Sequence, residues 1–171
     1  IDIFEKYSNA PYSVAWIDCL KKGENLGRSL VMMGKHTNIN DLPLSKRNAP
    51  FKTKIRKKIK IPFDFPSWFL SSWTVSIFNE FYFQIGKRNS KKKLVAWDQF
   101  FYPLDSIHGW NRIYGKKGFI QFQCVLPLSQ AKEGLNKLLQ ETSNSNLGSF
   151  LGVLKKFGGQ MSKFSFPMEG Y

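Results

Sequence analysis

Residues 100–127, FFYPLDSIHGWNRIYGKKGFIQFQCVLP, constrain the fold of this chain more than any other stretch. Segments rich in Trp and Tyr and a Gly-Lys-Lys-Gly turn lead into residues 119–126, whose β-branched and aromatic residues predict a strand. Because side chains alternate between the faces of a strand, Gln121 and Gln123 are expected to share one face, and Phe122 and Cys124 the other. From the residues alone, the two amides fit either a solvent-facing row or a row of hydrogen-bonding groups for a polar ligand.

The rest of the pattern predicts an α+β fold, in which an antiparallel sheet carries helices on one face. Strands are expected over residues 12–18 and 26–33, as an antiparallel pair, and over residues 149–157. A short helix after Pro66 is expected to lead into a strand through residue 84, followed by a charged hairpin turn over residues 86–93. The most regular helical stripe runs from an N-cap at Ser129 to about Glu141. Its apolar residues are Ala131, Leu135, Leu138 and Leu139.

Charge narrows the class of partner. Lys and Arg outnumber Asp and Glu by 26 to 12, for a formal net charge of +14. This excess fits nucleic acid, phospholipid or a phosphorylated substrate, and equally a solvated basic surface. The basic run at residues 52–60 is either a solvated loop or a patch for an anionic membrane. Nucleic acid is disfavoured because the sequence has no recognisable RNA- or DNA-binding motif. Arg28 interrupts an apolar strand and is expected to face solvent, with neutralisation of an anion as the alternative.

The cysteines and the hydrophobic segments limit the kinds of site and of membrane association that the sequence supports. Cys19 and Cys124 are single cysteines without the spacing of a zinc site or a disulfide framework, so buried thiols are expected. The uncharged residues 65–79 are too short to span a bilayer, which needs about 20 apolar residues. They fit core packing, with an interfacial aromatic patch as the alternative. A length of 171 residues fits one domain or one domain of a longer protein.

Motifs spread over most of the chain resemble the cap domain of FAD-linked oxidases of the vanillyl-alcohol-oxidase superfamily, most closely those of the decaprenylphosphoryl-β-D-ribose 2′-oxidase type. The resemblance is densest between Trp110 and Pro127 and weak over residues 35–99. The matching residues are Phe4-Glu5-Lys6-Tyr7, residues 13–18, Tyr102-Pro103-Leu104-Asp105, Trp110-Asn111-Arg112, Tyr114-Gly115, Gly118, Gln121-Phe122-Gln123, Ser149-Phe150-Leu151, Val153, Lys155, Phe157-Gly158 and Ser165-Phe166-Pro167.

The resemblance implies that residues 1–171 are one substrate-binding domain of a flavoprotein, and that a mostly upstream domain absent from this chain holds the FAD. It implies oxidation of a secondary alcohol of a polyprenylphosphoryl sugar to a ketone by hydride transfer to the flavin, in cell wall biosynthesis. The expected partners are that flavin domain, the lipid-linked sugar and a reductase for the ketone. The expected location is cytoplasmic or periplasmic, peripheral at the inner membrane, and the 171 residues alone are expected to be inactive.

Site residues follow from the same resemblance. Gln121, Gln123, Lys155 and Tyr102 are expected to bind substrate, and Gln123 and Lys155 are also expected to contact the FAD. No catalytic residue is assigned, and His108 is expected to be a loop residue without a role. Gly152 stands where the family pattern has an Asn, which leaves the substrate open. The alternatives are an oxidase for another alcohol or sugar lactone, and a basic module that binds nucleic acid or a membrane surface.

Overall fold

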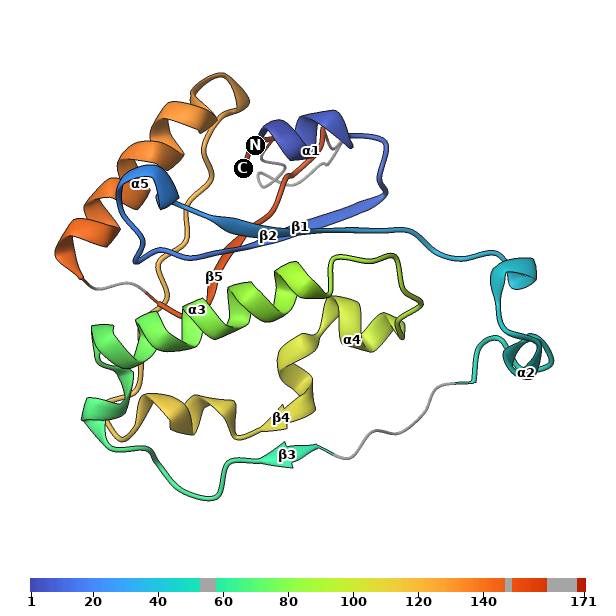
Figure 1. Cartoon of the computed structure of the whole chain (residues 1–171), viewed down its shortest axis with the longest axis horizontal. Coiled ribbons are helices and arrows are strands. Elements are labelled where there is room, and N and C mark those ends of the chain that lie inside the picture. The colour runs from blue at the N-terminus through green and yellow to red at the C-terminus, as the bar shows by residue number, and fades with distance from the viewer. Residues whose placement is uncertain (53–57, 147–148, 160–168) are drawn as a thin grey trace, which may run out of the picture. The chain divides into compact units, whose positions relative to one another are not determined.

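A computed structural model describes residues 1–52, 58–146, 149–159 and 169–171. These residues form two compact units, which are described separately (Figure 1). The first unit comprises residues 1–35, 71–90 and 121–171, and the second comprises residues 36–70 and 91–120. The predicted α+β class with an antiparallel sheet is confirmed. The expectations for residues 165–167 and for most of the basic run, residues 53–57, lie outside the described residues.

The first unit is built on a three-stranded antiparallel sheet in the order β2-β1-β5. Strands β1 (Tyr12–Ile17) and β2 (Ser29–Gly34) confirm the predicted antiparallel pair. Of the strand predicted over residues 149–157, only β5 (Gly152–Leu154) forms. The central strand is the most buried, because Ala15, Trp16 and Ile17 are each no more than 5% exposed.

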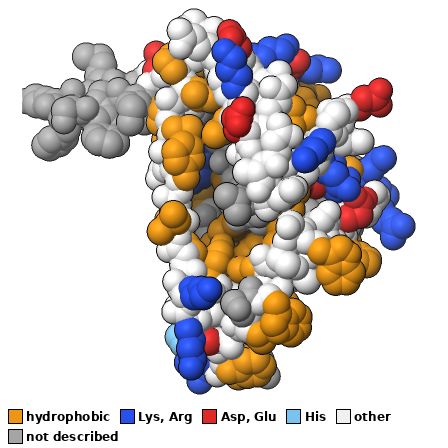
Figure 2. Space-filling model, turned by 90° about the vertical axis from the view of Figure 1, so that its left-hand side faces the viewer, with side chains coloured by type: hydrophobic (Ala, Val, Ile, Leu, Met, Phe, Trp, Pro, Cys, Tyr) orange, Lys and Arg blue, Asp and Glu red, His pale blue; other side chains and the backbone are white. Residues whose placement is uncertain are grey.

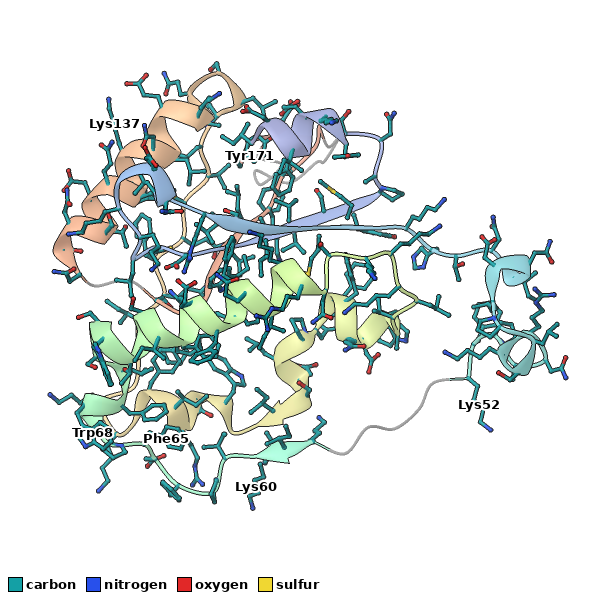
Figure 3. The ribbon with its side chains drawn as sticks, viewed as in Figure 1. Lys52, Lys60, Phe65, Trp68, Lys137 and Tyr171 are labelled. Atoms are coloured by element: carbon teal, nitrogen blue, oxygen red, sulfur yellow. The ribbon has the colours of Figure 1, made fainter. Side chains whose placement is uncertain are left out.

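Helices cover both faces of this sheet, although one helical face was expected (Figure 1). On the Ala15 face, α1 (Asp2–Lys6) and α5 (Ala131–Ser145) supply a small core around Phe4 and Ala131. Tyr171 joins this core and meets the Phe4 ring edge-on, with 5.7 Å between centroids (Figure 3). On the Trp16 face lies α3 (Ser72–Arg88). The second helical face gives the sheet a buried surface on each side.

Helix α3 replaces the strand predicted through residue 84, and this prediction was wrong. Ser71 caps the helix by accepting a hydrogen bond from the Thr74 backbone N–H, which satisfies one of its free donors. Val75 and Asn79 are buried at helical spacing, and a methyl group at Gly86 would lie 2.3 Å from a Leu30 side-chain carbon. The predicted hairpin turn therefore begins inside the last turn of a helix.

The strand predicted over residues 119–126 was also wrong. Among the described residues its backbone forms no strand ladder, and only Leu126 is paired, with Tyr171. A β-type sequence is stabilised by neighbours on a sheet, and no described strand lies beside this one. The helix after it is confirmed, but Gln130 rather than Ser129 is its N-cap, because a single 3-10 turn, η6 (Leu128–Gln130), comes first.

A buried polar network fixes α3 to the end of the sheet. The Asp18 side chain is fully buried and accepts hydrogen bonds from Arg28 Nε and Nη2 at 3.0 and 2.9 Å, and from Asn79 Nδ2 at 2.8 Å. Arg28 also contacts Glu80 at 2.8 Å and is only 12% exposed. The expectation that Arg28 faces solvent was wrong, and the alternative, neutralisation of an anion, holds because two carboxylates face it. The network joins β1, β2 and α3 in one polar cluster.

Acid is expected to weaken this network through Glu80. The hydrogen bond from Arg28 is the largest cause that lowers the pKa of Glu80, from 4.5 to about 2. A lowered folded-state pKa adds stability above pH 4.5 that disappears as the pH falls toward 2. Glu80 is partly exposed, so we expect Glu80→Gln to cost at most about 1 kcal/mol at pH 7. Melting temperatures of both proteins should converge between pH 4.5 and 2. A gap that widens on acidification would contradict this, and the exposed Glu133→Gln is the control.

The second unit contains short elements. They are α2 (Leu44–Arg47), α4 (Trp97–Phe101), a parallel pair of β3 (Ile59–Lys60) and β4 (Ile107–His108), and 3-10 turns η2 (Ile39–Asp41), η3 (Ser67–Leu70), η4 (Pro103–Ser106) and η5 (Trp110–Tyr114). A further 3-10 turn, η1 (Gly23–Asn25), belongs to the first unit. In the Tyr102-Pro103-Leu104-Asp105 motif, η4 begins at Pro103.

Arg112 ties η5 to the segment around Pro62. Its guanidinium donates to the carbonyl oxygens of Ile61 and Pro62 and lies 3.5 Å from an Asp64 carboxylate oxygen. Gly115, at φ 68°, passes so close to the Phe65 carbonyl that a methyl group would lie 2.4 Å from it. Phe65 in turn packs on Phe69, with Trp68 beside it (Figure 3). The Trp110-Asn111-Arg112 and Tyr114-Gly115 motifs therefore organise this unit.

Candidate functional site: an aromatic cluster and a lysine on one face of the sheet

Aromatic side chains gather on the Trp16 face of the sheet. The Trp16 and Tyr82 rings lie 4.8 Å apart between centroids, and Phe78 stacks on Tyr82 at 5.9 Å. Phe78 also meets Phe150 edge-on at 5.6 Å. The Trp16 indole N–H donates to the Phe150 carbonyl at 2.9 Å, which fixes the residues just before β5. We call Trp16, Phe78, Tyr82 and Phe150 the aromatic cluster. Phe78 and Tyr82 are 47% and 41% exposed, so the cluster presents rings to a ligand.

Lys155 is expected beside this cluster by the alternation of β5. Val153 pairs with Trp16, so the two side chains share a face, and Val153 is half exposed. One residue past the strand, Lys155 continues the Val153 face and is exposed. Lys156 points the other way, because its Nζ binds the Glu5 carboxylate at 2.9 Å on the α1 side. Lys155 has no hydrogen bond or ion pair with any described residue, which leaves its ammonium free for an anion.

The other predicted site residues do not all assemble. Gln121 and Gln123 are exposed and lie outside any helix or strand, and within the described residues no hydrogen bond joins either one to Lys155. Their place on a common face with Lys155 stays a prediction. Tyr102 belongs to the second unit, where it ends α4 and meets the Trp97 ring edge-on at 5.9 Å. Its role at a pocket rim also stays a prediction, and His108 lies exposed on β4.

The aromatic cluster was not predicted from the sequence. Residues 65–79 were interpreted as core or interface, and Phe150 was noted only as part of a matching motif. The members come from β1, α3 and the segment before β5, which are far apart in the chain. The available signal was the Ser149-Phe150-Leu151 motif next to Val153 and Lys155.

Packing explains the glycine at position 152. A side-chain carbon there would lie 2.7 Å from Cys19 Sγ and 2.8 Å from the Ile17 carbonyl oxygen. Real side-chain carbons do not approach a backbone oxygen this closely, so an Asn at position 152 requires the strands to shift. The pairing of β1 with β5 therefore leaves no room for an Asn side chain at position 152. Any ligand contact that the amide of an Asn would make there is absent.

The two cysteines are expected to react at different rates. Burial raises the pKa of the Cys19 thiol to about 11, and the nearby Asp18 acts in the same direction. Cys124 is exposed, so its prediction as a buried thiol was wrong. Because the thiolate is the nucleophile, iodoacetamide near neutral pH should label Cys124 fast and Cys19 slowly. Peptide mass spectrometry of the chain and of Cys124→Ser measures both rates. Equal rates for the two thiols would contradict this assignment.

Comparison with known proteins shows what this chain is similar to. The chain is 32% identical over 165 residues to a decaprenylphosphoryl-beta-D-ribose oxidase from Mycolicibacterium smegmatis. The chain is homologous to part of this oxidase. The match covers 96% of the chain but only 35% of the oxidase, so the chain spans about a third of its relative. No protein-family model matches the chain. The resemblance predicted from the sequence is confirmed.

Among the described residues, no group of His, Cys, Asp and Glu side chains is arranged to hold a metal ion. No described helix has the length and apolar character needed to cross a membrane.

Proposed function

We propose that this chain is the substrate-binding part of an FAD-dependent oxidoreductase that oxidises a secondary alcohol of a polyprenylphosphoryl ribose to a ketone. The observation that carries the proposal is homology over nearly the whole chain to an oxidase whose name states that substrate. The partially exposed aromatic cluster, with Lys155 expected on the same face, supports it. An aromatic surface suits a sugar ring or prenyl chain, and a free ammonium suits a phosphate.

The residues available here fit a supporting role toward a flavin. Gln121, Gln123 and Lys155 offer amide and ammonium donors that are free of described protein partners. Bound FAD would supply the hydride acceptor for the alcohol oxidation. Gln123 and Lys155 would hold its polar edge, and Gln121 would orient the sugar hydroxyl. Such positioning contributes most to the reaction rate by holding the reacting carbon close to the hydride acceptor.

Two other functions remain as alternatives. An oxidase for another alcohol or sugar lactone would keep the same fold, and Gly152, in place of an Asn, favours it because one polar contact is missing. A purely nucleic-acid-binding module has only the net charge of +14 in its favour. The oxidation product is a reactive ketone, so a separate reductase acting on it is the expected partner.

The test uses the complete polypeptide that contains this chain. We expect a purified protein with a flavin absorption spectrum that bleaches on adding polyprenylphosphoryl ribose without oxygen. A flavin that stays oxidised with this substrate but bleaches with another alcohol would contradict the substrate and retain the oxidase. Absence of flavin would contradict the whole proposal. We also expect the 171 residues alone to show no oxidation, measured with added FAD.

A further inference from the structure

Helix α3 carries a second apolar face, which points away from the sheet. Val75, Asn79 and Gly86 define the face that packs on β1 and β2. With about 100° of rotation per residue, the opposite face carries Trp73, Ile77, Phe81, Gln84 and Arg88, and Ile85 lies on its flank. We call the apolar residues Trp73, Ile77, Phe81 and Ile85 the outer stripe. They are 72%, 39%, 66% and 57% exposed, respectively. An outward helix face normally carries polar residues, so this face is built to be covered.

The charges of the same helix indicate what covers it. Glu80 is the single acidic residue of α3, and its carboxylate is bound by Arg28 at 2.8 Å and Lys21 at 3.2 Å. The outer face therefore has no free acid. Lys87 and Arg88 end the helix. Cations next to a Trp- and Phe-bearing stripe are complementary to an anionic surface that also accepts apolar side chains.

We propose that the outer stripe and the two cations that end α3, Lys87 and Arg88, form a docking surface for an anionic lipid bilayer. The helix would lie in the plane of the interface, with Trp73 and Phe81 inserted among the acyl chains and Lys87 and Arg88 on the phosphates. Figure 2 shows that hydrophobic side chains and Lys and Arg groups are both present on the surface of the molecule. This inference does not depend on flavin or on oxidation, since it concerns binding to lipid alone.

Vesicle sedimentation tests the docking surface. The 171-residue chain is mixed with vesicles of phosphatidylglycerol and phosphatidylcholine, or of phosphatidylcholine alone, and the pelleted fraction is measured. We expect strong pelleting only with the anionic vesicles. The double variant Trp73→Ser/Phe81→Ser should reduce the partition coefficient about tenfold or more. Lys87→Gln and Arg88→Gln should each reduce it about fivefold.

Matched controls distinguish binding through this surface from non-specific hydrophobic or electrostatic binding. Leu44→Ser/Phe51→Ser removes side chains that are 77% and 93% exposed elsewhere in the chain and should leave binding unchanged. Lys116→Gln/Lys117→Gln removes two exposed charges from a turn and should weaken binding less than Lys87→Gln/Arg88→Gln. Circular dichroism confirms that each variant is folded. Trp73 in the chain should also be quenched by brominated lipids, and this quenching should be lost in Trp73→Phe.

Three results would overturn the proposal. The first is equal pelleting of the chain and of Trp73→Ser/Phe81→Ser. The second is a dimer in sedimentation velocity that the same double variant dissociates without lipid, since a second copy would then cover the stripe. The third is a complete polypeptide whose vesicle binding is unaffected by the double variant, since other parts of the polypeptide would then cover it. None of these outcomes bears on flavin reduction, so the proposed function is tested separately.

Discussion

Asp18→Ala is expected to lower the free energy of unfolding of the first unit by about 3–5 kcal/mol. The Asp18 carboxylate is fully buried and accepts from Arg28, from Asn79 and from the Leu20 backbone N–H at 3.1 Å. Its removal leaves a buried guanidinium and a buried amide with too few acceptors. Arg28 keeps its ion pair with Glu80. Because Glu80 is partly exposed, this pair compensates for only part of the lost interaction with Asp18.

Urea unfolding followed by circular dichroism measures this loss. The surface variant Asp41→Ala is the control and should change stability by less than about 0.5 kcal/mol. Asp18→Asn should fall between the two, because an amide keeps one acceptor but turns a donor toward Arg28 or Asn79. A loss below about 1 kcal/mol in Asp18→Ala would show that water replaces the carboxylate and that the network does not fix α3.

Local patterns were sufficient where burial follows a regular period. β1 was predicted because β-branched and aromatic residues follow Pro11, and α5 because its leucines recur at helical spacing. Each of these elements packs one well-defined stripe against the Ala15 core. In both, local propensity and tertiary packing favour the same structure, so the sequence alone was informative.

Helix α3 shows where such patterns mislead. Trp73, Val75, Ile77 and Phe78 have the composition of a strand, and the exposed outer stripe conceals the usual contrast between apolar and polar helix faces. Only the Ser71 cap and the inward spacing of Val75, Asn79 and Gly86 indicate a helix. Residues 119–126 show the converse, since a strand-like sequence forms a strand only where a neighbouring strand pairs with it.

The candidate site depended on tertiary structure even more than the fold did. Lys155 was identified by resemblance, and register supports its place because Val153 pairs with Trp16. Periodicity does not predict that Tyr82 and Phe150 both reach Trp16, since this depends on how α3 packs on the sheet. The same holds for Arg28, which looks like a solvent-facing strand residue until Asp18 and Glu80 are placed beside it.

In the complete polypeptide, Lys155→Met is expected to lower kcat/KM for polyprenylphosphoryl ribose about 10- to 100-fold, the usual value of a hydrogen bond to a charged group. Methionine keeps the length and apolar stem of lysine and removes only the ammonium. Lys156→Met is the matched control, because its side chain binds Glu5 on the opposite side of the sheet. It should stay within about threefold of the parent, since a partly exposed ion pair away from the aromatic cluster contributes little.

The flavin spectrum and a double-variant cycle show which ligand Lys155 serves. If Lys155 binds substrate, Lys155→Met retains its flavin and loses substrate affinity; if it also binds FAD, flavin content falls as well. Gln123→Leu should lower kcat/KM by a similar factor. If Gln123 and Lys155 hold the same ligand, the loss in Lys155→Met/Gln123→Leu is not the product of the single losses. If the loss in the double variant equals the product of the two single losses, the two side chains act in independent sites. The prediction of one shared site would then be wrong.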